Sequence, residues 1–238
     1  MSAKDFIRLA QSLSPALFRL PLLGDLRSLD AYGRATSIAY VTNQPKWLRG
    51  KKGFEFCPGS KWNTACGGIS VPDGGVAAEL QGTAFTLVAL SRRFGPFEAA
   101  PAAPYIIAKR DAGGSNYGIL FLSAGASIGL TNGVGVSTMT SSAIVGARSI
   151  AVRFSSGVAP SLFVNGIFKA TGDTALVITA NDADLVLGNV NINPGAVYNY
   201  GSPFFGYQGF LIFNDALLGR AITDQEISEL HDAWESIV

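Results

Sequence analysis

Residues 161–173 read Ser-Leu-Phe-Val-Asn-Gly-Ile-Phe-Lys-Ala-Thr-Gly-Asp, two short apolar runs on either side of Asn165-Gly166. Both central residues of a type I′ turn have positive φ, which Asn and Gly tolerate best. The stretch therefore predicts a tight antiparallel hairpin. Asn132-Gly133 gives the same indication more weakly, because the apolar runs around it are less regular.

The chain on both sides of this hairpin has the same character. Short runs rich in Val, Ile, Leu, Phe and Thr alternate with Gly, Pro, Asn and Asp, which predicts about fourteen strands. These are residues 17–23, 37–42, 53–57, 68–71, 84–92, 105–110, 117–123, 127–131, 148–155, 161–164, 167–170, 175–178, 184–187 and 207–213. No helices lie between them, and a parallel sheet needs such crossovers. We therefore expect an all-β fold, a two-sheet antiparallel jelly-roll sandwich.

Helices are predicted at the two ends of the chain. Residues 1–15 form a short amphipathic helix capped by Ser2, and residues 223–236 form a second one that begins with a Thr223–Glu226 capping box. The remaining chain, residues 16–238, is expected to be one sandwich domain that includes the C-terminal helix. The apolar stripe of the first helix either packs on its own domain or docks onto another subunit. The candidate docking residues are Phe6, Ile7, Leu9 and Leu13.

Composition limits the function classes. Only 15% of the 238 residues are charged, against about 25% in average proteins. This excludes a disordered chain and a charge-driven nucleic-acid binder, and we interpret the basic segment 46–52 as a solvated turn. No signal peptide or membrane-spanning run is evident, so we expect synthesis in the host cytoplasm without membrane insertion. Cys57 and Cys66 are either two reduced thiols or a loop disulfide.

Charge is distributed unevenly along the chain. Residues 1–61 have a balance of +6, and residues 171–238 have a balance of −8. Either the two regions neutralise each other within one subunit, or they steer head-to-tail contacts between copies.

Four segments together resemble a known superfamily. They are the strand that begins AFTLVALSRRF at Ala84, the hairpin 161–173, the strand DLVLGN at 184–189, and the run from Phe204 to Leu230. Their order resembles the laminin-G-like, concanavalin-A-like lectin/glucanase superfamily over residues 16–236, in modules of the kind found in phage virion proteins. The resemblance implies a glycan- or protein-binding module, although some members are glycosidases.

Catalytic chemistry is not indicated. A retaining glucanase of this fold would need carboxylates alternating along one strand, Glu-x-Asp-x-Glu, and no such run is present. The pair Asp182 and Asp184 lies where a solvated turn enters a strand. The single histidine, His231, borders the apolar face of the last helix, as a packing residue does. We therefore predict that the protein is not an enzyme.

Two sets of side chains are candidates for ligand binding. Tyr198, Tyr200 and Tyr207 lie in or near a Gly- and Pro-rich loop region and offer ring faces to a sugar or a protein. The resemblance also raises calcium as a cofactor, since loop oxygens at the rim of a sandwich suit this ion. The candidate ligands are Asp111, Asn116, Asp182 and Asp184, and the alternative for each is ordinary turn chemistry.

These features favour a non-enzymatic structural or adhesive module of a large assembly. The most specific form of this hypothesis is a phage decoration, head-fibre or tail protein on the virion surface. Its expected partners are other virion or assembly proteins and further copies of itself, with a glycan as an additional ligand. The alternative is a free carbohydrate-binding lectin, with or without calcium.

Overall fold

The computed structural model describes residues 2–15, 17–19, 39–40, 46–47, 54–55, 69–71, 84–91, 105–110, 116–122, 127–178, 183, 185–187 and 207–238. Within these residues the helices are α1 (Ala3–Ser12), α2 (Asp215–Leu218) and α3 (Asp224–Glu235), together with a 3-10 helix at Ser142–Ile144. The strands are β1 (Leu17–Arg19), β2 (Ala39–Tyr40), β3 (Lys46–Trp47), β4 (Phe54–Glu55), β5 (Ile69–Val71), β6 (Ala84–Ser91), β7 (Tyr105–Arg110), β8 (Asn116–Leu122), β9 (Ser127–Thr131), β10 (Val136–Thr140), β11 (Ser149–Ser155), β12 (Ser161–Val164), β13 (Ile167–Thr171), β14 (Leu185–Leu187) and β15 (Tyr207–Asn214).

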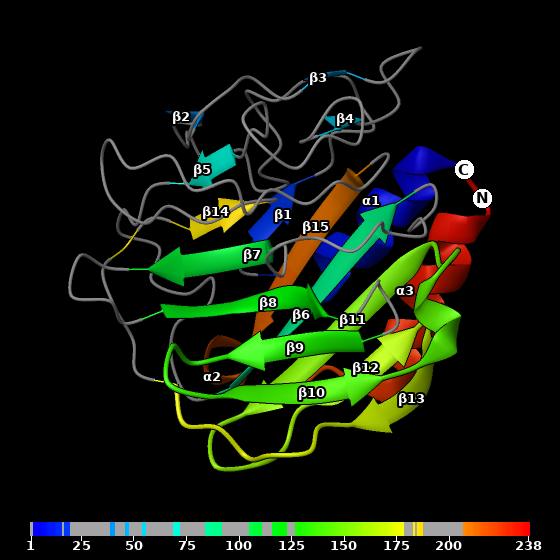
Figure 1. Ribbon diagram of the computed structural model, residues 1–238. Helices are drawn as coiled ribbons and strands as arrows, with labels where there is room; N and C mark the ends of the chain where they lie inside the picture. Colours follow the sequence, from blue (N-terminus) through cyan, green and yellow to red (C-terminus); the bar gives the residue numbers. More distant parts are fainter. Residues whose placement is uncertain are drawn as a thin grey trace.

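The described strands form two antiparallel sheets, as expected for an all-β sandwich (Figure 1). The larger sheet has the order β13-β12-β11-β6-β15-β4-β3, and β1 also pairs with β15. The smaller sheet has the order β10-β9-β8-β7-β14-β5-β2. The sandwich architecture is thus confirmed, while the jelly-roll connectivity stays a prediction.

Apolar side chains cover both faces of the larger sheet. Along β6, Phe85, Leu87 and Ala89 belong to the core between the sheets, whereas Val88 and Leu90 belong to a second cluster on the outer face. Successive side chains of a strand point to opposite faces, so a continuous apolar run such as that of β6 is buried on both. The outer face therefore needs its own cover, and helices α1 and α3 provide it.

Helix α1 packs against its own chain. The Phe6 ring is fully buried, and its centroid lies 5.5 Å from that of Trp234 in α3. Ile7, Leu9 and Leu13 are partly buried against the same outer cluster. This corrects the placement of Phe6 on a docking face, because a ring enclosed by its own domain cannot contact another subunit. Docking through the remaining three residues stays a prediction.

Local sequence rules account for the helix ends. Ser2 and Asp5 form a capping box at α1, and Thr223 and Glu226 form one at α3. In each box the hydroxyl accepts a backbone N–H while the carboxylate accepts the N–H of the capping residue. Both caps agree with the sequence-based expectation.

The hairpin predicted around Asn165-Gly166 is also present, formed by β12 and β13. Asn165 and Gly166 have φ values of 50° and 75°, which is the left-handed region that a type I′ turn requires. Asn132-Gly133 differs, because only Gly133 has positive φ there and a four-residue loop joins β9 to β10.

Three segments differ from the predicted secondary structure. Residues 175–178 are not a strand: the segment buries Leu176 and Ile178 but has irregular backbone. Strand β10 was not expected, since its sequence Val-Ser-Thr-Met-Thr is mostly polar. Lys46–Trp47 was expected in a turn and instead forms β3, paired with β4.

Cys57 and Cys66 lie outside the described residues, so the choice between two thiols and a loop disulfide stays open.

Helices within the described ranges are too short or too polar for any of them to traverse a lipid bilayer.

Candidate binding surface

Four exposed valines lie in or directly beside three connections of the sandwich that hydrogen bonds join, and we call them the valine rim. Val134 lies in the β9–β10 loop and is 97% exposed, and Val136 begins β10 with 42% exposed. Val158 lies in the β11–β12 connection with 56% exposed, and Val177 lies in the segment after β13 with 64% exposed. Clustered exposed apolar side chains mark interaction surfaces more often than isolated ones do.

The loop that carries Val134 is held by its own hydrogen bonds. The Asn132 Oδ1 atom accepts the backbone N–H groups of Val134, at 3.1 Å, and of Gly135, at 2.8 Å. The backbone N–H of Gly133 donates to Thr131 Oγ1 at 3.0 Å. An asparagine that bonds the backbone two and three residues ahead fixes a turn. Val134 is thus presented in a defined position.

Further hydrogen bonds join the three connections. Asn132 Nδ2 donates to the carbonyl of Val177 at 3.0 Å, and the backbone N–H of Gly157 donates to the carbonyl of Leu176 at 2.9 Å. The Leu176 side chain is buried in the core between the sheets. The rim is therefore one unit anchored to the core.

The segment after β13, residues 172–178, closes the side of the sandwich between the two sheets. Thr138 and Asp173 exchange two bonds: the Thr138 N–H donates to Asp173 Oδ1 at 2.9 Å, and the Asp173 N–H donates to the Thr138 carbonyl at 3.2 Å. The backbone N–H of Thr174 donates to Ser137 Oγ at 3.2 Å. Figure 1 shows this connection, in yellow, running beside β10 after β13. These contacts attach the chain directly before residues 175–178 to β10.

The rim carries almost no charge. Residues 132–136, 155–160 and 172–178 contain one charged side chain, Asp173, whose carboxylate is already bonded to the backbone of β10. The surface is aliphatic rather than aromatic. Such chemistry suits an apolar, uncharged protein surface better than a sugar ring, which stacks on aromatic faces.

The predicted tyrosines are mostly outside the described part of the chain. Tyr198 and Tyr200 lie outside the described residues. Tyr207 begins β15, where its backbone is paired with Ser91 of β6 and Phe54 of β4. A ligand-binding role for the three tyrosines stays a prediction.

The predicted calcium ligands also lie mostly outside the described part of the chain. Asp111, Asp182 and Asp184 lie outside the described residues, and Asn116 begins β8 with its backbone opposite Arg110. Within the ranges that the structure describes, no three His, Cys, Asp or Glu side chains form a cluster suited to a metal ion. Calcium binding stays a prediction.

His231 lies on α3 and faces Ser149 of β11. Its Nδ1 atom is 2.9 Å from the hydroxyl of Ser149, which is itself buried. Burial lowers the pKa of His231 below its usual value, while Glu235 and Asp232 oppose the shift. The position matches the packing role expected from the sequence.

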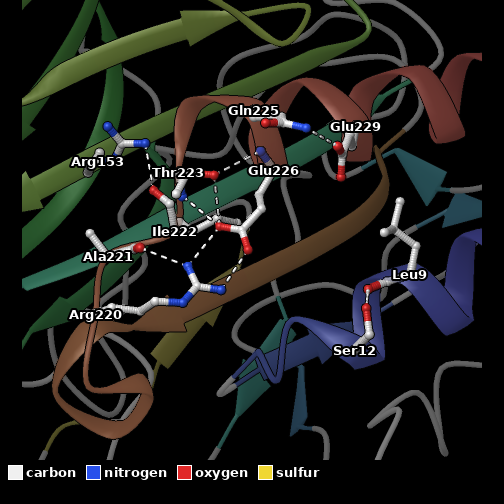
Figure 2. Close-up of polar contacts among 10 residues, drawn as sticks. All are labelled: Leu9, Ser12, Arg153, Arg220, Ala221, Ile222, Thr223, Gln225, Glu226 and Glu229. Carbon is white, nitrogen blue, oxygen red and sulfur yellow. Dashed lines mark hydrogen bonds and ion pairs between the residues drawn. The ribbon is translucent and has the colours of Figure 1, made fainter.

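A polar network at the start of α3 was not predicted beyond its capping box. Figure 2 shows the Arg220 guanidinium against the Glu226 carboxylate, with nitrogen–oxygen distances of 2.6 and 2.8 Å. Arg153 of β11 reaches the same loop, where it donates to the Ile222 carbonyl at 2.6 Å and to Asp224 Oδ1 at 2.7 Å. The network fixes the loop before α3 to the outer face of the larger sheet.

The sequence contained one indication of the rim. Gly133-Val134-Gly135 places an apolar residue between two glycines in a loop, where burial is not expected. The other three valines could not be associated with it from sequence, because the connections meet only in the folded chain.

The chain matches no protein-family model and no curated protein sequence. Its fold is similar to solved structures of botulinum neurotoxin binding domains. The serotype G binding domain superposes with a TM-score of 0.64 at 15% identity, over 94% of this chain and 52% of that one. A structure of botulinum neurotoxin type C, whose cell entry depends on interaction with two ganglioside molecules, has a TM-score of 0.63 at 13% identity, over 95% of this chain and 53% of that one.

A third neighbour is the binding domain of botulinum neurotoxin DC in complex with rat synaptotagmin II. It has a TM-score of 0.64 at 13% identity, over 93% of this chain and 52% of that one. The chain thus spans about half the length of these structures. At such low identity the likeness concerns the fold alone, and it agrees with an all-β sandwich.

Proposed function

We propose that this protein is a non-enzymatic binding module of a larger assembly, and that the valine rim is its contact with a second copy of the chain. The observation that carries the proposal is Val134, almost fully exposed on a loop fixed by Asn132 and joined to two further valine-bearing connections. An aliphatic side chain exposed on a rigid loop gains free energy when a contact buries it.

The absence of charge on the rim supports a second copy as the partner. In a symmetric interface the same patch contacts itself, so a charge near the two-fold axis is brought close to its own copy. Asp173 is the single charged residue of the rim segments, and its carboxylate is bonded to Thr138. A neutral aliphatic patch is therefore well suited to self-association.

The more specific form of the proposal is a phage decoration, head-fibre or tail protein on the virion surface. It rests on the resemblance to modules of that kind, and the fold shared with receptor-binding domains supports a binding role. Assembly proteins and further copies would be the partners, and a host glycan would be an additional ligand.

Sedimentation velocity of the purified chain tests the rim. We expect a concentration-dependent oligomer for the wild-type protein and a monomer for the variant with both Val134→Asp and Val177→Asp. Val145→Asp is the matched control, since Val145 is 38% exposed but lies outside the rim. A monomeric wild-type protein, or an unchanged oligomer in the double variant, would show that the rim does not mediate self-association.

A free lectin is the second candidate, favoured by the similarity in fold to botulinum neurotoxin type C, whose cell entry depends on interaction with gangliosides. A glycan array probed with the protein in calcium, and again with a chelator, distinguishes a calcium-dependent lectin from a calcium-independent one. Calcium-dependent binding would support Asp111, Asn116, Asp182 or Asp184 as ligands, and binding that survives chelation would support the tyrosines. An array without binding would eliminate the lectin and leave the assembly module.

A further inference from the structure

The sequence contains two Asn-Gly dipeptides, which share one chemical reactivity but have different surroundings. Asn132-Gly133 lies between β9 and β10, and Asn165-Gly166 lies between β12 and β13. Asparagine before glycine is prone to spontaneous loss of ammonia, because glycine has no Cβ to hinder the attack of its backbone nitrogen on the asparagine side chain. The fold then decides which of the two dipeptides reacts.

This deamidation has two steps. The backbone nitrogen of the glycine attacks Cγ of the asparagine, so that an N–Cγ bond forms, the Cγ–Nδ2 bond breaks, and ammonia leaves with the proton that the glycine N–H has lost. Solvent water then opens the five-membered succinimide ring at one of its two carbonyls, which gives aspartate or isoaspartate. The reaction therefore needs solvent at the glycine and a peptide bond that can turn to close the ring.

The surroundings of Asn165-Gly166 oppose both requirements. Gly166 is buried, and a Cβ placed on it would lie 2.9 Å from the Cα of Ser228 in α3. The Asn165 Oδ1 atom accepts the backbone N–H groups of Arg148, at 2.8 Å, and of Ser149, at 3.3 Å. Turning this peptide bond would press the hairpin against α3 and break two hydrogen bonds at the start of β11.

The surroundings of Asn132-Gly133 satisfy both requirements. Gly133 and Val134 are exposed, and a Cβ placed on Gly135 would meet no atom nearer than 3.7 Å. The loop is held by the bonds of the Asn132 side chain and by the Gly133 N–H, which donates to Thr131 Oγ1. Hydrogen bonds within one short exposed loop open locally at a lower free energy than a turn packed between a sheet and a helix.

We propose that Asn132 is a site of spontaneous deamidation, and that this modification weakens self-association through the valine rim. The second part rests on the function proposed above. Asn132 Nδ2 donates to the carbonyl of Val177 at 3.0 Å, and this bond joins two of the connections that form the rim. Deamidation puts an oxygen in the place of Nδ2, so that two acceptors face each other and the bond is lost.

The new carboxylate also changes the charge of the rim. Asp173 is the single charged residue of the rim segments, and its carboxylate is bonded to the backbone of Thr138. A further negative charge at position 132 would be repeated on the second copy in a symmetric interface. Isoaspartate also adds a carbon to the backbone and so lengthens the loop that presents Val134. Both products act against the contact.

Peptide mapping of the wild-type protein tests the modification. After ageing in mildly alkaline buffer, trypsin separates the two sites, because peptides 111–148 and 154–169 contain one each. Mass spectrometry should show several-fold more deamidation at Asn132 than at Asn165 in the folded protein, and similar deamidation at both after ageing in urea. Equal or greater deamidation at Asn165 in the folded protein, none at Asn132, or a difference that persists in urea would overturn the proposal.

Sedimentation velocity tests the consequence. Asn132→Asp reproduces the aspartate product, and the dissociation constant of the oligomer should rise by about tenfold or more. The aged wild-type protein provides the same comparison without a substitution. Asn165→Asp is the matched control, since it adds the same charge outside the rim and retains an acceptor for the backbone at the start of β11.

The outcomes separate the two proposals. If Asn132→Asp and the aged protein associate like the fresh wild-type protein, the modification does not regulate the rim. A monomeric wild-type protein would instead refute self-association through the rim, while the peptide map would still decide whether Asn132 is modified.

Discussion

His231 illustrates how a single buried side chain makes stability depend on pH. The imidazole is half-buried against Ser149, and burial lowers its pKa below the usual 6.5. The unfolded chain then binds the proton more readily than the folded one. Stability is therefore fully present above about pH 6.5 and is lost as the pH falls from there toward the lower folded pKa.

We expect the melting temperature of the wild-type protein to fall between about pH 7 and about pH 5, with a shallower fall in His231→Asn. Asparagine retains an acceptor near Ser149 but cannot titrate. Thermal denaturation across this range measures the difference. Parallel curves for the two proteins would mean that His231 titrates with an ordinary pKa.

Stability also depends on pH through Glu226, which is an acidic group whereas His231 is a basic one. Its hydrogen bonds to Arg220 and to Thr223 lower the pKa of the carboxyl to about 2, against partial burial that raises it. The folded state therefore favours the ionised form. The stability this provides is present above pH 4.5 and is lost as the pH falls through the interval down to about 2.

Glu226→Gln should lower the free energy of unfolding by about 1 kcal/mol at neutral pH, because it weakens the capping box and removes the charge paired with Arg220. The variant should also lose part of the acid sensitivity below pH 4.5. Denaturant titrations at neutral and acidic pH provide both values. Glu229→Gln, on the same helix and outside the box, is the control.

At the scale of elements, the β12–β13 turn is packed directly onto α3. A Cβ atom added at Gly166 would lie 2.9 Å from the Cα of Ser228 and 3.0 Å from the Cβ of His231. Gly157 has nearly the same φ, 76° against 75°, but a Cβ there meets no atom within 4 Å. An alanine at Gly157 therefore reports backbone strain alone, whereas an alanine at Gly166 reports backbone strain together with a steric conflict.

Gly157→Ala should cost about 1 kcal/mol, the strain of a left-handed alanine. Gly166→Ala should cost clearly more, because the hairpin and α3 must also move apart. Chemical denaturation of the two variants measures the difference. Equal losses would mean that the turn does not press against α3 in solution.

Sequence reasoning succeeded for elements whose signals are local. The Asn165-Gly166 turn and the Thr223–Glu226 box depend on residues within a few positions of one another, and both are present. It failed for β10, where only Ser137 and Met139 face inward and the other three positions are Val136 and two threonines. It also failed for residues 175–178, whose burial depends on hydrogen bonds to β10 and to the β11–β12 connection.

The valine rim was not predictable for the same reason. It unites residues from distant parts of the sequence and depends on the strand order. The pairing of Thr86 with Arg153 is a similar case, because no rule of spacing associates the two without knowing that β11 lies beside β6.

At the scale of the whole molecule, the fold has two apolar layers. One lies between the sheets, and the other lies between the larger sheet and the helices α1 and α3. The first helix and the last are thus joined across the full length of the chain by Phe6 and Trp234. Because α1 contributes to a core, its removal should weaken the domain as well as any assembly.

Phe6→Ala tests this integration. Truncating a fully buried phenylalanine costs about 3–5 kcal/mol, so the variant should unfold at markedly lower denaturant concentration than the wild-type protein. Leu9→Ala, on the same helix but only partly buried, should cost less. If Phe6→Ala unfolds with the wild-type midpoint while sedimentation shows a lost oligomer, α1 serves as an intersubunit anchor. If the midpoint falls and folded Leu9→Ala still oligomerises, α1 is a core element and self-association belongs elsewhere, where the valine rim is the candidate.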